Sequence, residues 1–221
     1  MQILYVDNHL LVVYKPAGLP VQADASGDID LLTLAKAWIK KEYSKPGEVF
    51  VGLVHRLDRP ARGVVVLART SKAAARLSEQ FRSRTTHKRY EVVVLGQPEP
   101  PAAELHDQLF SDERGTRVVS SGSASSLHYR TLEHRGDRTW LEVDLHSGRK
   151  HQIRVQLASR GWPVLGDLRY GAKNPLQDQS IALLARRLDI DHPTRSERLS
   201  FVAPDPPGWP WQPNEGRDFL S

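Results

Sequence analysis

The chain of 221 residues contains no cysteine. This absence excludes disulfide bonds, thiolate ligands for zinc and a cysteine nucleophile, and it is compatible with a cytosolic protein. No apolar run is long enough to form a transmembrane helix. The N-terminal residues 1–15 include an acidic residue and alternate like strands, so they do not form a secretory signal. We therefore expect a cytoplasmic protein without a membrane-spanning segment.

Several motifs that bind cofactors are also missing. The chain has no GxxxxGK[ST] phosphate loop, no GxGxxG fingerprint and no GxSxG elbow. Its nine histidines are scattered, and His146 and His151 do not form the HExxH pattern of a zinc site. We therefore expect neither a metal ion nor a cofactor, nucleotide cofactors included.

The basic residues are gathered in two places. Lysine and arginine total 31 against 26 acidic residues, a net charge of +5. The first cluster precedes a predicted strand and consists of Arg82, Arg84, His87, Lys88 and Arg89. The second cluster lies before and within a predicted helix and consists of Arg149, Lys150, His151 and Arg154. Such patches are typical of surfaces that bind nucleic-acid phosphates, although a solvated basic face has the same composition.

Hydrophobic periodicity and turn residues predict an irregular mixture of strands and helices. The predicted strands are 2–6, 10–14, 51–54, 64–67, 90–95 and 139–145, and the predicted helices are 30–41 (capped by Asp28 or Asp30), 72–82 (capped by Thr70 or Ser71) and about 150–160, ending at Gly161. Residues 97–103 are proline-rich and read as a connection, and 107–126 as an exposed hairpin or excursion. The tail from Pro204 is expected to pack over the surface. The mixture predicts an α+β protein with a mixed, mostly antiparallel central sheet and flanking helices.

The segment HRLDRPARG, residues 55–63, stands out because it places charges between two apolar runs. A buried charge without a partner is costly, so these residues are expected to be paired. Asp58 could act as a nucleophile or base that the neighbouring cations keep ionised. A structural ion pair between an arginine and Asp58 explains the segment equally well.

Three further groups are candidates. Tyr90 follows a basic cluster, where an aromatic ring can stack on an unpaired base; a tyrosine of the core would look the same. Lys150 and Arg154 lie four residues apart, which predicts a helix with a basic and an apolar face, unless Arg154 reaches inward to a carboxylate. Residues 166–171, GDLRYG, suggest a constrained loop with a structural role.

Four motifs together resemble the RluA-type family of RNA pseudouridine synthases. HRLDRPARGVVVLART is similar to that family's HRLDxxTSGxxxxA signature, and ILYVDNHLLVVYKPAG to its N-terminal strand pair. HKRYEVVVLG resembles its KxY strand, LHSGRKHQIRVQLASRGWPVLGDLRYG its TGRxHQIRxHLAxxGxPIxGDxxYG block, and LHYRTLEH a further recurrent segment. The match runs from about residue 3 to about residue 202.

The resemblance implies roles for individual residues. Asp58 would be the essential aspartate, Tyr90 the tyrosine that stacks on the target uracil, and Arg154 the partner of the Asp58 carboxylate. Arg56 would hold or replace the flipped nucleotide, and Ile153 would lie beside the site. The remaining residues expected to bind RNA are His55, Lys88, Arg89, Arg149, Lys150 and His151. The family fold is a mixed sheet with an RNA-binding cleft, and no cofactor or metal is needed.

The chain departs from the family pattern at two places. Ala61-Arg62 replaces a Thr-Ser pair before Gly63, and Tyr14 replaces an asparagine before Lys15. The chain starts directly with the catalytic region, so we expect residues 1–221 to form a single catalytic domain without a separate N-terminal RNA-binding domain.

The expected activity is isomerisation of uridine to pseudouridine in a stem-loop of ribosomal or transfer RNA, by a monomer. Two alternatives stay open. A synthase that has lost activity could act as an RNA-binding assembly factor. A hydrolase with paired carboxylates is disfavoured because Asp58 has no acidic partner in a comparable motif.

Overall fold

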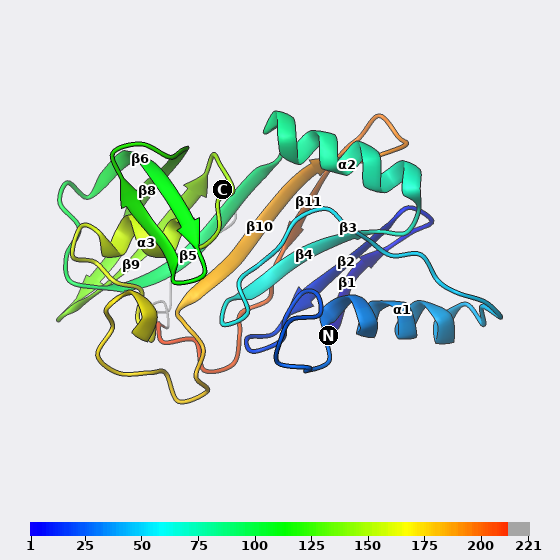
Figure 1. Cartoon of the computed structure of the whole chain (residues 1–221), viewed down its shortest axis with the longest axis horizontal. Helices are drawn as coiled ribbons and strands as arrows, with labels where there is room; N and C mark the ends of the chain where they lie inside the picture. Colours follow the sequence, from blue (N-terminus) through cyan, green and yellow to red (C-terminus); the bar gives the residue numbers. More distant parts are fainter. Residues whose placement is uncertain (212–221) are drawn as a thin grey trace.

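A computed structural model describes residues 1–211, and a single mixed β-sheet runs through the molecule (Figure 1). Its strands are β1 (Gln2–Val6), β2 (Leu10–Lys15), β3 (Gly52–Leu53), β4 (Arg62–Ala68), β5 (His87–Leu95), β6 (Ala102–Asp112), β7 (Gly115–Val119), β8 (Ser123–Arg135), β9 (Arg138–Leu145), β10 (Leu183–Asp191) and β11 (Arg198–Val202). The helices are α1 (Leu31–Glu42), α2 (Ser71–Ser83), α3 (Gln152–Ala158) and the 3₁₀ helix η1 (Leu168–Tyr170).

The strand order is β1-β2-β4-β10-β5-β9-β8-β6-β7, with β3 paired to β4 and β11 paired to β10. Among the described residues, β10 and β4 form the parallel pair and the other neighbours are antiparallel. Figure 1 shows β10 crossing the middle of the molecule, between a half that carries α1 and α2 and a half that carries α3. The predicted α+β class with a mostly antiparallel sheet is confirmed.

A glycine makes the parallel junction between β4 and β10 possible. Gly63 has φ +127°, and a Cβ atom there would lie 2.3 Å from the carbonyl oxygen of Ala185. Only a residue without a side chain fits so close to a neighbouring backbone. The glycine that ends HRLDRPARG thus fixes this loop next to the central strands.

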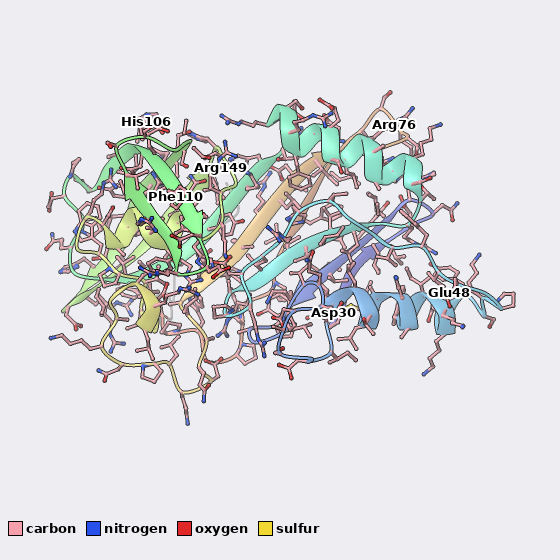
Figure 2. All side chains as sticks on the ribbon, in the orientation of Figure 1. Asp30, Glu48, Arg76, His106, Phe110 and Arg149 are labelled. Carbon is pink, nitrogen blue, oxygen red and sulfur yellow. The ribbon has the colours of Figure 1, made fainter. Side chains whose placement is uncertain are left out.

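Helices α1 and α2 start where the sequence predicts. Asp30 caps α1 by accepting a hydrogen bond from the Thr33 N–H at 3.0 Å, and Thr70 caps α2 by accepting from the Ala73 N–H at 3.2 Å. Asp30 lies at the start of α1 in Figure 2. The buried residues of the two helices belong to different core clusters, on opposite faces of β2 and β4. Period-two alternation in these strands divides the core in this way.

The prediction for residues 97–126 is wrong in part. Strand β6 begins at Ala102, inside the expected connection, and pairs with β8 from Ala102 to Leu109. Of the two alternatives for residues 107–126, the hairpin is correct and the excursion is wrong: β6 pairs with β7 from Gln108 to Val119, and these strands extend the sheet together with the start of β8. The excursion was predicted from the polar composition of residues 107–126, but strands with one solvated face have the same composition.

The helix predicted at 150–160 is shorter than expected, and it is buried where a basic face was expected. It spans Gln152–Ala158, because His151 adopts a left-handed conformation with φ 55° and ends the helix on its N-terminal side. Residues 152–157 are all buried, so the expected basic face does not exist. Arg154 is among the buried residues, whereas Lys150 precedes the helix and is exposed.

The sequence analysis does not predict strands β10 and β11, although residues 187–191 and 198–201 alternate between polar and apolar side chains. The part of the tail that the structure describes, Pro204 to Trp211, does pack on the protein: Trp211 lies near Trp140 and donates to Glu133 at 3.1 Å. The remainder of the predicted tail lies outside the described residues. Within residues 1–211, the helices are too short or too polar to cross a bilayer.

Candidate active site

A cavity of about 1110 Å³ lies between the two halves of the molecule. The segments that line it come from both halves: residues 20–24, 53–59, 81, 82, 84, 88, 90, 145, 147–154 and 183. Its apolar lining includes Leu57, Leu145, Ile153 and Leu183, and its charged lining is mainly basic. Such a cavity suits a flat ring joined to phosphates.

Asp58 and Arg154 meet in this cavity, although they are 96 residues apart. Arg154 Nη1 donates to Asp58 Oδ2 at 3.0 Å. The same guanidinium donates from Nε and Nη2 to both oxygens of Asp167, at 2.6 and 2.9 Å. The side chains of Arg154 and Asp167 are 5% and 1% exposed, that of Asp58 22%. Asp167 therefore fixes the guanidinium plane, and the third donor is aimed at the accessible carboxylate.

Burial of Arg154 opposes its charge, but the ion pairs with Asp167 and Asp58 outweigh burial and raise the pKa of Arg154 above its usual value. Arg154 is therefore a permanent cation between two carboxylates. Asp167 belongs to the GDLRYG segment, for which the sequence predicted only a structural loop. Asp167 could have been predicted as a partner of Arg154, because a buried arginine needs more than one acceptor.

His151 faces the second oxygen of Asp58, and Tyr170 contacts both His151 and Arg154. His151 Nε2 lies 4.0 Å from Asp58 Oδ1, and His151 Nδ1 lies 2.8 Å from the Tyr170 hydroxyl. The Arg154 guanidinium lies over the Tyr170 ring, 5.0 Å from its centroid. Sequence reasoning placed His151 among the RNA-binding residues and did not single out Tyr170.

Tyr90 is half-buried on β5, packs against the main core cluster and lines the cavity. Burial raises the pKa of Tyr90 well above its usual range, and the charge of Asp58 adds to this shift. Tyr90 is therefore a neutral phenol that presents its ring to the cavity. The contact with the core matches the interpretation as a core tyrosine, and stacking on a base stays a prediction.

Strand β5 separates the first basic cluster onto two faces of the sheet. Lys88 lines the cavity, and burial, with Arg84 nearby, lowers the pKa of Lys88 to about 8. Arg89 points the other way and forms an ion pair with Asp144 at 2.9 Å. His87 contacts Asp144 and Asp189, at 3.0 and 3.2 Å. Neither His87 nor Arg89 lines the cavity.

His55 has a structural bond. Its Nε2 accepts a hydrogen bond from the Val66 N–H at 3.0 Å, and its ring stacks on Phe81 with centroids 4.6 Å apart. Burial lowers the pKa of His55 to about 3, with Lys88 adding to the shift. His55 lines the cavity as a neutral ring and not as a cation.

Three of the exposed cations in the lining are residues that the sequence predicted to bind RNA. Arg56, Arg149 and Lys150 are exposed at the cavity, and within residues 1–211 Arg56 makes no ion pair. The turn that carries Arg149 is held by Gln152, whose Oε1 accepts from the Arg149 N–H at 3.1 Å and from the Ser147 hydroxyl at 2.8 Å. Arg149 is labelled in Figure 2, in the same half as His106 and Phe110 of β6.

Lys15 is a further buried residue that sequence reasoning did not select. It is fully buried, and its ammonium donates to the carbonyl oxygens of Pro16, Leu19 and Arg59 at 3.0, 2.8 and 3.1 Å. Burial lowers the pKa of Lys15 to about 7, and the charge of Asp58 opposes this shift. Lys15 thus ties the Asp58 loop to the turn after β2. The sequence feature that indicates Lys15 is KPAG, which supported only the family resemblance.

The substituted pair Ala61-Arg62 lies outside the cavity lining. Ala61 is fully buried, and the 5% exposed Arg62 donates to Asp178 at 2.9 Å and to Ser180. These contacts tie the Asp58 loop to the segment before β10. The replacement of Thr-Ser by Ala61-Arg62 therefore changes the contacts that support the loop, and it leaves the cavity wall unchanged. Within residues 1–211, no three His, Asp or Glu side chains gather as a metal site.

Comparisons with known proteins point to one family. A family model described as RNA pseudouridylate synthase matches residues 9–159. Ribosomal large subunit pseudouridine synthase D of Pseudomonas aeruginosa is 33% identical over 96% of this chain and 70% of its own length. The protein of the same name from Xylella fastidiosa is 36% identical over 93% of this chain and 66% of its own length. The chain thus spans about two thirds of these relatives.

A solved structure has the same fold. Human RNA Pseudouridylate Synthase Domain Containing 4 superposes with a TM-score of 0.78 at 25% identity, over 94% of this chain and 90% of that one. The resemblance drawn from the four motifs is confirmed by the family model and by the curated relatives. The chain belongs to the RNA pseudouridylate synthase family, as a member of its RluA type.

Proposed function

We propose that this chain isomerises a uridine of RNA to pseudouridine in the cavity between its two halves, with Asp58 as the catalytic carboxylate. The observation that carries this proposal is the orientation of Asp58. Its Oδ2 is held by Arg154 at 3.0 Å, and Arg154 is itself anchored on the buried Asp167. A carboxylate fixed in this way needs little reorganisation when it acts on a bound nucleotide.

The reaction cuts the bond between N1 and C1′, turns the uracil and joins C5 to C1′. The nucleotide must first leave its stack, because a base cannot turn inside a helix. The ring of Tyr90 and the apolar residues Ile153 and Leu183 offer a surface on which uracil can turn, since stacking tolerates rotation better than fixed hydrogen bonds do. Lys88, Arg149 and the other cations of the lining would hold the neighbouring phosphates.

We propose large-subunit ribosomal RNA as the target. The support is that two similar relatives are named ribosomal large subunit pseudouridine synthase D. A loop within the RNA is favoured over a duplex because its bases are already unstacked. We propose further that a single copy of the chain forms the whole site, since both halves of the cavity come from one chain.

The test is tritium release from RNA labelled at uridine C5, because the new C5–C1′ bond expels that hydrogen. Ribosomal and transfer RNA are assayed separately with wild type, Asp58→Asn and the control Asp137→Asn, whose side chain is 82% exposed. We expect release from ribosomal RNA by wild type and by the control. Asp58→Asn should slow release by about 1000-fold or more, while its Kd for RNA stays within about threefold.

Unchanged release by Asp58→Asn would exclude this residue as the catalytic carboxylate. Release from transfer RNA alone would refute the proposed target. If wild type binds RNA but releases no tritium from either pool, the alternative of an inactive RNA-binding relative is correct.

A further inference from the structure

Asp58 has a second neighbour besides Arg154, and it lies on the side of the other carboxylate oxygen. Arg154 holds Oδ2, whereas His151 Nε2 faces Oδ1 at 4.0 Å. Building on the proposed function, we infer that His151 is a positioning residue for Asp58, held by Tyr170 in the tautomer that carries its proton on Nε2. This role differs from that of a cation that binds phosphate.

The tautomer follows from the hydrogen bonds of Tyr170. Its hydroxyl oxygen accepts from the Thr116 N–H at 3.1 Å and lies 2.8 Å from His151 Nδ1. Among residues 1–211, His151 Nδ1 is the acceptor that the structure offers to the hydroxyl proton, because the backbone amide can only donate. Nδ1 is therefore unprotonated in the neutral ring, and the ring proton sits on Nε2, toward Asp58.

The backbone and the packing hold His151 in this place. Its φ of 55° is uncommon for a residue with a side chain, and its side chain is only 12% exposed. The ring meets the Tyr170 ring edge-on, with centroids 5.7 Å apart. A strained backbone at a site indicates that the position of the side chain matters.

Tyr170 is supported in turn by the β6–β7 hairpin. Thr116 belongs to β7, and Arg169, next to Tyr170, donates to the Arg114 carbonyl in the turn of that hairpin at 2.9 Å. Tyr170 also lies under the Arg154 guanidinium. One tyrosine therefore contacts both residues that face the Asp58 carboxylate, and the hairpin fixes its position.

The charge of His151 agrees with this role. Burial lowers the pKa of His151 to about 4; Asp58 opposes the shift, and Arg154, Arg169 and Lys150 add to it. At neutral pH the ring is uncharged, so Nε2–H can donate to Asp58 without a second buried cation. The 4.0 Å separation is longer than a hydrogen bond, and such contacts often shorten when substrate binds.

The first test reads the tautomer without reference to activity. Ring ¹⁵N NMR of the histidines at pH 7, assigned with His151→Gln, should show His151 protonated on Nε2 in the free protein. In Tyr170→Phe, which lacks the hydroxyl, the Nδ1-protonated form should appear. A His151 protonated on Nδ1, or doubly protonated, in the wild type would overturn the inference.

The second test uses two amide variants. The side-chain amide of His151→Gln can place an N–H near the position of Nε2, whereas His151→Asn tolerates the left-handed backbone but is too short to reach Asp58. We expect the single-turnover rate at saturating RNA to fall about tenfold in His151→Asn and in Tyr170→Phe, and to stay within about threefold in His151→Gln. The Kd for RNA should change by less than about twofold in all three. His128→Leu, on β8 and outside the cavity lining, is the control.

The outcomes separate the two proposals. A higher Kd with an unchanged rate in both amide variants would make His151 an RNA ligand and overturn its positioning role. A His151→Asn rate equal to wild type would do the same while the proposed function stands. A wild type that releases no tritium overturns the proposed function and, with it, the role of His151.

Discussion

Arg154 shows how the meaning of one residue depends on its partners. An arginine that is 5% exposed is unfavourable unless its donors are satisfied, and three of them reach the oxygens of Asp167 and Asp58. Removing one partner of such a pair costs about 3 to 5 kcal/mol, although the intact pair contributes little net stability. The ion pair with Asp167 therefore matters less for stability than for the direction of the bond to Asp58.

Acid should destabilise the protein through His55. Its pKa is about 3 in the folded state and about 6.5 in the unfolded chain, so the unfolded state binds the extra proton between these values. The part of the free energy of unfolding that depends on neutral His55 is fully present above pH 6.5 and is lost as the pH falls toward 3. We expect a loss of about 1.4 kcal/mol per pH unit from this residue, measured by urea unfolding between pH 6.5 and 4.5.

His55→Gln is the matched control for this pH dependence. The glutamine oxygen can accept the Val66 N–H that His55 Nε2 accepts at 3.0 Å, but it does not titrate. The stability of this variant should fall less steeply with acid than that of the wild type. Equal slopes in the two proteins would show that His55 is not the group responsible.

Among the elements, β5 determines which of its own basic residues face the cavity. Side chains alternate between the faces of a strand, so Lys88 and Tyr90 face the cavity while Arg89 pairs with Asp144 on the neighbouring strand β9. The sequence shows one continuous basic cluster here. Strand geometry divides it into a part that can bind phosphate and a part that is neutralised.

Replacing Lys88 and Arg89 separately tests this division. Lys88→Gln should weaken RNA binding about fivefold at 0.1 M salt and lower the slope of log Kd against log salt by about 0.7, the loss of one phosphate contact. Arg89→Gln should change the Kd by less than about twofold. Filter binding over a salt series measures both, and an equal loss in the two variants would contradict the assignment of faces.

The junction of β4 and β10 depends on Gly63. In Gly63→Ala the new Cβ would overlap the Ala185 backbone, and the variant should lose about 3 kcal/mol or more of unfolding free energy. Gly136→Ala also has positive φ, but nothing lies within 4 Å of its Cβ, so its loss should be about 1 kcal/mol. Urea unfolding of both variants measures the difference. Similar losses would mean that backbone conformation alone, and not close approach, requires Gly63.

At the scale of the whole molecule, the cavity exists because the sheet brings distant segments together. Asp58 precedes β4, Tyr90 lies on β5 and Arg154 on α3, and the parallel pairing of β10 with β4 joins the two halves. Neither half contains the complete site. A bound RNA should therefore contact segments of both halves at once.

Hydrogen exchange with and without RNA tests this arrangement. Bound RNA should slow exchange in residues 20–24, 53–59 and 147–151, which line the cavity from both halves, and should leave β11 unchanged because it lies outside the lining. Protection confined to one half would show that RNA binds elsewhere. The effect should weaken at high salt, because phosphate contacts dominate nucleic-acid binding.

The sequence alone determined the family, the fold class, the caps of α1 and α2 and the choice of Asp58, Tyr90 and Arg154 as candidates. These features are local: motifs, periodicity and capping residues act within a few positions of the chain. The family model and the relatives confirm the family, and the structure confirms the fold class and the two caps.

Tertiary structure decided which residues meet. It buried Arg154 and supplied Asp167 as its anchor, turned Arg89 away from the cavity, gave His55 a backbone donor and brought Tyr170 to His151. These pairings join residues far apart in the chain, and no local pattern encodes which carboxylate a buried cation selects. The physical reason is that desolvation makes an unpaired charge costly, so the fold as a whole determines where each charge finds its partner.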